Sequence, residues 1–251
     1  MVKLSGVLIT RNEEQNLAPA LESLGFCDEL LVVDSGSTDR TVEIARGMGA
    51  RVEVKTPWPG FVAQRTAATS AAGNDWILAL DADERVSPAL RDEIQALQQG
   101  GFAHAAYRIP RVTRYLGRWI RCTDWYPDSQ LRLFDRTKGD WQGGLVHESF
   151  RTRGSVGSLS GEIEHHPYRD VFHHVEKMNV YTSLWAEHAY AEGRRVGPLS
   201  GLPSSAWALF RNLVLKRGLW LGGVGITVSG LNSYYTFLKF AKLRDRARSG
   251  P

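Results

Sequence analysis

Apolar runs alternate with stretches of helical spacing along the first part of the chain. A run such as Trp76–Leu80 predicts a strand buried on both faces of a sheet, because successive side chains of a strand point to opposite faces. The predicted strands cover residues 7–10, 29–34, 51–55 and 76–80. Between them, Leu17, Leu21 and Leu24 recur at the spacing of one helix face. Strands that alternate with helices predict an α/β fold with a parallel sheet and helices on both of its faces.

Small polar residues mark the starts of the predicted helices. Asn12 can cap a helix, and Gln15, three residues on, can close a capping box. Ser87 followed by Pro88 predicts a second helix start, with Pro at the first helical position. Because Ser87 supplies this cap, the carboxylates that precede it, Asp81, Asp83 and Glu84, are expected to have no structural role.

Three carboxylates, Asp81, Asp83 and Glu84, directly follow the apolar run. Residues i and i+2 of an extended chain point to the same side, so Asp81 and Asp83 can converge on one spot. Paired hard oxygen ligands suit Mg²⁺ or Mn²⁺, and open α/β sheets bind ligands at the carboxyl ends of their strands. We therefore predict a divalent metal site at Asp81 and Asp83; the alternative is a simple helix cap.

Polar residues also end or follow the first two predicted strands, namely Thr10, Asn12, Asp34, Ser35 and Asp39. These side chains would line the same crevice as Asp81 if the strands are neighbours. A helix amino terminus there can hold phosphate, and a carboxylate such as Asp34 can accept hydrogen bonds from a base or ribose. Taken alone, Asn12 and Asp39 are better explained as cap or turn residues. The glycine patterns of dinucleotide dehydrogenases and P-loop phosphotransferases do not occur in the sequence, which disfavours both classes.

Aromatic residues and further acids distinguish the middle of the chain. The segment 111–127 is rich in Trp, Tyr and Arg, side chains that sugar sites use but that are more often part of a core. His147-Glu148 comes after a Gly-Gly pair, so Glu148 could act as a general base and His147 as a third metal ligand. A surface Glu beside a buried His explains the pair equally well. Asp128 competes with Glu148 for the role of base.

The last third of the chain is predicted to be helical from Asp170 onward. Residues 218–238 contain no charged side chain but five Gly, so they are too polar and flexible for a membrane span. Residues 200–251 combine aromatic with basic side chains, which predicts a segment that lies on an anionic membrane surface. The alternative is a helical pair buried against the first domain or a second subunit. The basic residues expected to face lipid phosphates are Lys239, Lys242, Arg244, Arg246 and Arg248.

Composition narrows the class of protein. A chain of 251 residues with 43% hydrophobic residues can bury a substantial core. Residues 200–251 carry a net charge of +7 and residues 1–199 one of −3, which together give the net charge of +4. No basic stripe or nucleic-acid module occurs outside residues 200–251, so nucleic acid is not expected as a partner. Two cysteines and no recognisable signal segment predict a reducing, cytoplasmic environment.

Three sequence blocks, in this order, resemble the inverting family 2 glycosyltransferases of the GT-A fold. The blocks are residues 8–14 (LITRNEE), 32–41 (VVDSGSTDRT) and 80–84 (LDADE). Later blocks, among them LRLF at 131–134 and LVHE at 145–148, resemble the bacterial branch that adds glucose or a related hexose to the lipopolysaccharide inner core. The resemblance implies a GT-A, Rossmann-like mixed sheet flanked by helices, with a C-terminal helical extension.

The resemblance also implies domains and residue roles. The catalytic domain would cover residues 1–168 and the helical region residues 169–251. Asn12, Glu13 and Asp34 would hold the nucleoside, and Arg65 would lie near the base or the diphosphate. The full donor-binding set would be Thr10, Asn12, Glu13, Asp34, Ser35, Arg65, Asp81 and Ala82. The metal, Mg²⁺ or Mn²⁺, would be held by Asp83, Asp81 and His147.

Together these observations predict an enzyme that moves a hexose, with glucose the first candidate, from a nucleotide-diphosphate sugar such as a UDP-hexose. The acceptor would be a lipid-linked saccharide of the lipopolysaccharide core or another cell-envelope glycan. Glu148 or Asp128 would act as base in a single displacement with inversion. The protein would be cytoplasmic and peripheral on the cytoplasmic face of the inner membrane. Two alternatives stay open: a family 2 transferase acting on a polyprenyl phosphate or protein acceptor, and a non-catalytic module that binds nucleotide or glycan.

Overall fold

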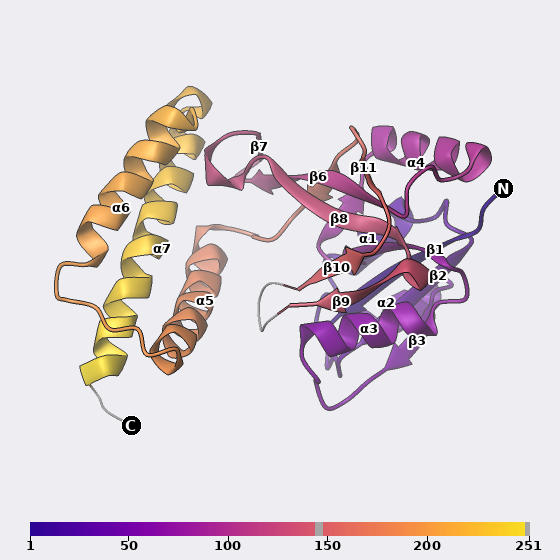
Figure 1. Cartoon of the computed structure of the whole chain (residues 1–251), viewed down its shortest axis with the longest axis horizontal. Helices are drawn as coiled ribbons and strands as arrows, with labels where there is room; N and C mark the ends of the chain where they lie inside the picture. The colour runs from indigo at the N-terminus through magenta and orange to yellow at the C-terminus, as the bar shows by residue number, and fades with distance from the viewer. Residues whose placement is uncertain (144–147, 249–251) are drawn as a thin grey trace. The chain divides into compact units, whose positions relative to one another are not determined.

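The computed structural model describes residues 1–143 and 148–248 (Figure 1). These residues form two compact units. The first, the sheet unit, comprises Met1–Val112 and Asp128–His166. The second, the helical unit, comprises Thr113–Pro127 and the described residues from Pro167 onward. Residues 113–127 therefore pack with the helices, whereas the sequence predicts one boundary after residue 168.

Parallel strands form the first half of the sheet unit. They are β1 (Leu4–Thr10), β2 (Glu29–Asp34), β3 (Arg51–Val54) and β4 (Trp76–Asp81). Their order is β3-β2-β1-β4, and all three pairings are parallel. The four strands and the parallel sheet predicted from the apolar runs are thus confirmed.

Antiparallel pairings make the whole sheet mixed. Its other strands are β5 (Glu84–Val86), β6 (Ala106–Tyr115), β7 (Arg118–Ile120), β8 (Asp128–Asp135), β11 (Val156–Ser158) and β12 (Ile163–His165). β8 pairs antiparallel with β4, and the sheet continues through β6, β12 and β5. A separate hairpin consists of β9 (Gly139–Gln142) and β10 (Ser149–Thr152), and η2 (Arg136–Lys138) precedes it. This mixed sheet is the one that the family resemblance implies.

Alternate residues of the central strands enter two cores, one on each face of the sheet. The helices that cover the sheet are α1 (Leu17–Ser23), α2 (Thr41–Gly47), α3 (Phe61–Ala71) and α4 (Pro88–Gly100). Leu8 of β1 belongs to one core together with Leu21 of α1 and Ile94 of α4. Its neighbour Ile9 belongs to the other core together with Ala68 of α3. The carboxyl ends of β1, β2 and β4 are therefore held by packing on both sides.

The predicted helix start at Asn12 is wrong. Asn12 has a φ of 54°, and α1 begins only at Leu17. The Asn12 side chain instead accepts a hydrogen bond from the Thr38 amide in the loop after β2 (2.8 Å). The start predicted at Ser87 is confirmed, because Ser87 Oγ accepts a hydrogen bond from the Leu90 amide (3.2 Å).

Helices dominate the helical unit. They are α5 (Val171–Ala191), α6 (Gly201–Phe210) and α7 (Gly223–Arg248), with η3 (Arg211–Leu215) and η4 (Gly218–Leu221) between α6 and α7. β7 (Arg118–Ile120) pairs with the end of β6, and η1 (Thr123–Trp125) follows it. The predicted start of α5 is confirmed, because Asp170 accepts a hydrogen bond from the His173 amide (2.7 Å). None of the described helices is long and apolar enough to cross a membrane.

A buried histidine lies in the aromatic core of the helical unit. His174 is 3% exposed, stacks on Tyr168 at 4.0 Å between ring centroids, and bonds through Nδ1 to the Tyr115 hydroxyl (3.1 Å). Burial, together with the positive charge of nearby His173 and Lys177, lowers the pKa of His174 from 6.5 to about 4. The folded helical unit therefore holds this imidazole neutral.

The stability of the helical unit is expected to fall between pH 6.5 and about 4. In this window His174 is protonated in the unfolded chain but neutral in the folded chain. The free energy of unfolding should therefore fall by about 3 kcal/mol and then level off. Well above pH 6.5 His174 is neutral in both states and contributes no pH dependence. Urea unfolding across this range should show the slope in the wild type and a flatter profile in His174→Gln. His188→Gln, at an exposed histidine, is the control; an equal slope in wild type and His174→Gln would contradict the expectation.

Candidate active site

Two loops at the carboxyl ends of β1 and β2 are bound to each other. The Asn12 amide donates to Ser37 Oγ and the Glu13 amide to Thr41 Oγ1, both at 2.8 Å. Thr10 lies opposite Asp34 in the parallel register, and β4 flanks β1 on the other side. The strand ends that carry the predicted donor-binding residues are therefore neighbours, as the crevice hypothesis requires.

The carboxylate of Asp34 organises its own turn. Asp34 is 1% exposed, and its Oδ2 accepts hydrogen bonds from the Gly36 and Ser37 amides, each at 2.8 Å. Ser37 Oγ donates to its Oδ1. Gly36 has a φ of +85°, and a Cβ there would lie 2.8 Å from Thr56, so the turn requires glycine. A contact of Asp34 with a nucleoside stays a prediction.

Buried polar atoms at the same strand ends have no hydrogen-bond partner. Within the described residues, neither Thr10 Oγ1 nor Gln64 Oε1 is paired, although both side chains are buried. Gln64 Nε2 donates to Ser35 Oγ (3.1 Å), which links α3 to the β2 loop. An unpaired buried polar group costs free energy, so these atoms favour a ligand that supplies the missing hydrogen bonds. Sequence patterns did not single out Gln64 as a site residue.

A chain of alternating charges runs from the end of β4 through the antiparallel half of the sheet. We call it the ion-pair chain. Four carboxylates alternate with three guanidinium groups in the order Glu148, Arg65, Asp81, Arg132, Glu84, Arg111 and Asp128. Its two ends are the two residues predicted as candidate bases.

Asp81 lies within the ion-pair chain, between Arg65 and Arg132. Arg65 Nη2 donates to its Oδ1 and Arg132 Nη2 to its Oδ2, each at 2.6 Å. Burial alone would raise the pKa of Asp81, but Arg132, Arg65 and Arg111 outweigh burial and hold that pKa well below its usual range. Asp81 therefore stays ionised, and both of its oxygens are already bonded to arginine. Arg65 is in turn fixed by the Trp141 ring, whose centroid lies 4.9 Å from the guanidinium carbon.

Glu84 has a structural role that the sequence pattern did not indicate. It is fully buried, and its Oε1 accepts hydrogen bonds from Arg111 Nη1 (2.6 Å) and Arg132 Nη2 (3.0 Å). Its Oε2 accepts one from the Asp81 amide (3.0 Å). The expectation that all three acids after β4 are free of structural roles is therefore wrong for Glu84. Sequence patterns also did not single out Arg132 as a site residue, although a lone charge in the apolar run LRLF could have indicated it.

The two candidate bases differ in how their oxygens are occupied. Asp128 Oδ2 accepts from Arg111 Nε and Nη2 (2.8 and 2.6 Å), and Gln130 Nε2 donates to its Oδ1 (2.5 Å). Glu148 Oε1 accepts from Arg65 Nε at 3.1 Å, while its Oε2 accepts no hydrogen bond within the described residues. A base needs an accessible lone pair. Glu148 therefore meets the requirement better than Asp128.

The predicted metal ligands are only partly brought together. His165 Nε2 lies 3.6 Å from Asp83 Oδ2, a neighbour that sequence spacing did not reveal. His147 lies outside the described residues. Among residues 1–143 and 148–248, no three His, Cys, Asp or Glu side chains are grouped so as to hold a metal. Asp83 and His165 fit Mg²⁺ or Mn²⁺ if a diphosphate and water supply the remaining ligands, as these ions commonly require.

Several basic residues of α7 have partners on α5. Lys242 Nζ donates to the Asn179 carbonyl (2.6 Å), and Arg246 Nε pairs with Glu187 Oε2 (2.9 Å). Lys239 Nζ lies 4.9 Å from the centroid of a Trp185 ring. The expectation that the α7 cations face lipid phosphates therefore stays a prediction, and three of them also have partners on α5.

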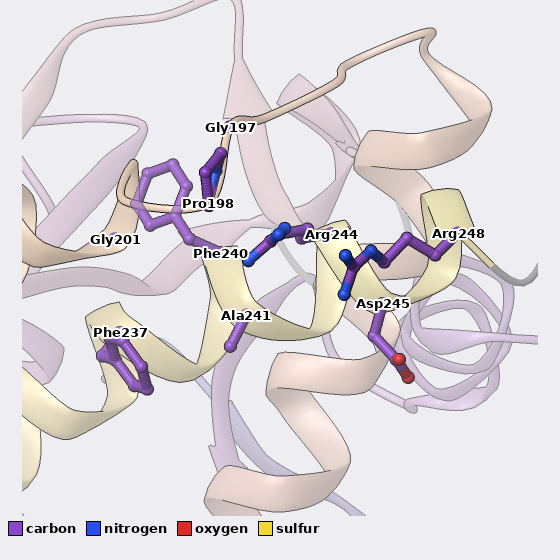
Figure 2. Close-up of a pocket in the computed structure, with 9 residues that line it drawn as sticks. All are labelled: Gly197, Pro198, Gly201, Phe237, Phe240, Ala241, Arg244, Asp245 and Arg248. Carbon is purple, nitrogen blue, oxygen red and sulfur yellow. The ribbon is translucent and has the colours of Figure 1, made fainter.

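Arg244 and Arg248 line a hollow between α7 and the segment that leads into α6. Figure 2 shows both guanidinium groups on the same side of α7, with Asp245 pointing away from them. Phe237 and Phe240 form the apolar part of this hollow. It belongs to the helical unit and contains no residue of the ion-pair chain.

A family model described as "Glycosyl transferase family 2" matches residues 5–156 of the chain. An uncharacterised glycosyltransferase of Rickettsia prowazekii (strain Madrid E) is 31% identical over 98% of this chain and 88% of its own length. The lipopolysaccharide core biosynthesis glycosyltransferase LpsC of Rhizobium meliloti (strain 1021) is 30% identical over 97% of this chain and 92% of its own.

Among solved structures, glucosyl-3-phosphoglycerate synthase from Mycobacterium tuberculosis is similar to part of the chain. That crystal structure contains Mn²⁺, UDP and glucosyl-3-phosphoglycerate. The match has 27% sequence identity and a TM-score of 0.37. It covers 45% of this chain and 44% of the synthase, so the chain spans less than half of that protein.

Proposed function

Because the chain belongs to glycosyl transferase family 2 and has the GT-A fold, we propose that it transfers a hexose from a UDP-sugar to a cell-envelope glycan, with inversion. Glucose is the first candidate for the sugar, and a lipid-linked lipopolysaccharide core saccharide is the first candidate for the acceptor. Similarity to LpsC over nearly the whole of both chains supports this acceptor class. The observation that carries the proposal is the ion-pair chain, which brings Arg65 and Glu148 to the end of β4.

The nucleoside diphosphate would occupy the carboxyl ends of β1, β2 and β4. Thr10 Oγ1 and Gln64 Oε1 are buried and unpaired there within the described residues, so they could bond to the nucleoside. Asn12, Glu13, Asp34 and Ser35 shape the two loops around this position, and Ala82 follows Asp81 at the turn. Arg65 would offset negative charge that develops on the diphosphate during bond cleavage.

A divalent ion would be held by Asp83 and His165, with Asp81 nearby in sequence. When bound, the ion supplies positive charge that stabilises the leaving diphosphate. The protein offers only part of the ligand set in the described residues. We therefore propose that metal and nucleotide bind together, since the diphosphate oxygens complete the coordination.

The reaction would be a single displacement with Glu148 as base. Glu148 removes the proton of an acceptor hydroxyl, and the acceptor oxygen forms a bond to the anomeric carbon from the face opposite the diphosphate. The bond between that carbon and the diphosphate oxygen breaks, and UDP leaves with the electron pair. Arg65 bonds to both Glu148 and Asp81, so it fixes the base relative to the donor site.

Asp83→Ala is expected to abolish the effect of metal on donor binding. Calorimetric titration of the wild type with UDP should give a tighter Kd with Mn²⁺ than with chelator, and the variant should lose at least about tenfold in the presence of Mn²⁺. Asp92→Ala, at an exposed carboxylate of α4, should behave as the wild type. An Asp83→Ala protein whose Kd still responds to Mn²⁺ as the wild type does would exclude Asp83 as a ligand.

The basic, aromatic region 200–251 would bring the enzyme to an anionic membrane, where a lipid-linked acceptor resides. Support for this part of the proposal comes from composition and from the exposed apolar residues of α6 and η4. Product extraction into organic solvent separates a lipid-linked acceptor from a water-soluble one.

A further inference from the structure

The outward face of α6 and its continuation is apolar. Eight large side chains there are between 36% and 75% exposed: Leu202, Trp207, Leu209, Phe210, Val214, Leu215, Leu219 and Trp220. We call this set the α6–η4 face. A helix on the surface of a protein in water normally turns polar residues outward. An exposed apolar patch of this kind marks an interaction surface.

Polar side chains occupy the inner side of the same hairpin. Asn212 and Ser229 are completely buried. Asn212 Oδ1 accepts hydrogen bonds from the Asp124 amide (2.8 Å) and from Asn232 Nδ2 of α7 (2.9 Å). Ser233 Oγ of α7 donates to the Ser205 carbonyl of α6 (2.8 Å). The buried side of the hairpin therefore combines hydrogen-bonded polar groups with apolar residues such as Ala208 and Val228, whereas its outward side carries large exposed apolar side chains.

Glycines allow its segments to approach closely. A Cβ on Gly225 would lie 1.9 Å from the Gly218 carbonyl oxygen, and a Cβ on Gly218 would lie 2.6 Å from Ser229 Oγ. Close contact through small residues, together with hydrogen bonds between helices, is how helices pack where the surroundings are lipid. Figure 1 shows α6 running alongside α7 within this unit.

The charge of the region matches an anionic surface. No Asp or Glu occurs between Glu192 and Asp245. Lys216 and Arg217 are exposed and lie between Leu215 and the η4 residues of the α6–η4 face. Each cation near an anionic bilayer adds attraction, and long basic side chains can keep their charge in the headgroup layer while the apolar residues beside them enter it.

We propose that the α6–η4 face inserts into the boundary between headgroups and acyl chains of an anionic membrane. The hairpin would lie in the plane of the interface, because none of the described helices is long and apolar enough to span. This inference rests on the proposed lipid-linked acceptor, and within residues 200–251 it assigns the inserted surface to α6 and η4.

Vesicle flotation tests the inference with the full chain. Wild type should bind vesicles of phosphatidylcholine mixed with phosphatidylglycerol, and bind vesicles of phosphatidylcholine alone more weakly. The double variant Trp207→Ser, Trp220→Ser should lose about tenfold in partitioning for each Trp. The double variant Lys216→Gln, Arg217→Gln should lose about fivefold in partitioning for each cation removed, and this loss should occur on the mixed vesicles only. Phe172→Ser is the matched control, because Phe172 on α5 is 73% exposed but lies outside the face.

Two further measurements keep the outcome unambiguous. Donor hydrolysis by water, measured as UDP release from UDP-glucose without vesicles, should be unchanged in all these variants, so that loss of docking is separated from failure of the proposed function. Light scattering reports the oligomeric state. Wild type that fails to bind either vesicle, or a Trp double variant that binds like Phe172→Ser, would overturn the inference. A wild-type dimer that the Trp substitutions dissociate, without vesicle binding, would overturn it in favour of an interface between two copies.

Discussion

Glu148→Gln is expected to lower turnover about 10²- to 10⁴-fold, because positioned general-base catalysis typically contributes that much. The amide oxygen of Gln can still accept a hydrogen bond from Arg65 Nε, which lies 3.1 Å from Glu148 Oε1. The fold and the position of Arg65 should therefore be retained. UDP affinity should change little, so the loss should appear in kcat. Single-turnover measurements with UDP-glucose and a core-saccharide acceptor separate the chemical step from product release.

Asp128→Asn is the matched control for that prediction. Asp128 is the other end of the ion-pair chain, and both of its oxygens already accept hydrogen bonds from Arg111 and Gln130. Asparagine can keep part of these contacts, so turnover should fall much less than in Glu148→Gln. A near-normal Glu148→Gln enzyme together with an inactive Asp128→Asn enzyme would assign the base to Asp128 instead.

Arg132→Met is expected to destabilise the sheet unit by about 3–5 kcal/mol, the usual cost of removing one partner from a buried ion pair. Arg132 is 6% exposed and donates to both Asp81 and Glu84. Methionine fills most of the volume but leaves two carboxylates close together without the charge between them. Burial would lower the pKa of Arg132, but Asp81 and Glu84 raise it further, so the guanidinium stays charged throughout the accessible pH range. Urea unfolding monitored by circular dichroism measures the loss.

Arg40→Met provides the comparison for this stability prediction. Arg40 pairs with Glu43 on the surface, where the side chains are 70% and 68% exposed, so no measurable loss is expected. Adding Glu84→Gln to Arg132→Met should recover part of the stability, because it removes one of the two carboxylate charges that would then lie close together without Arg132 between them. If Arg132→Met unfolded at the same urea concentration as Arg40→Met, the ion-pair chain would not stabilise the site.

Local signals were sufficient for the parallel half of the fold. The apolar runs that end at Thr10, Asp34 and Asp81 each form a strand in the structure, because a strand buried on both faces needs a nearly continuous apolar run. Ser87 and Asp170 cap the helices that they were predicted to cap. The family resemblance was confirmed over the residues that carried it.

The site depends on contacts that local patterns do not contain. Arg132 of β8 reaches Asp81 of β4 only because these strands pair antiparallel across a long separation in sequence. Arg111 reaches Glu84 in the same non-local way. Asn12 was misassigned as a cap because its partner, Thr38, lies in another loop. Sequence spacing indicated which residues are candidates for the site. Contacts between residues distant in the sequence determine which of their atoms are already hydrogen-bonded within the protein.

The most direct test of the central claim is calorimetric binding of UDP, GDP, CDP and ADP to the full chain, each with Mn²⁺ and again with chelator. A nucleotide site at the ends of β1, β2 and β4 predicts that UDP binds selectively and that Mn²⁺ strengthens the binding. Absence of binding by all four diphosphates, or equal binding of all four with and without metal, would contradict a sugar-nucleotide site in this crevice.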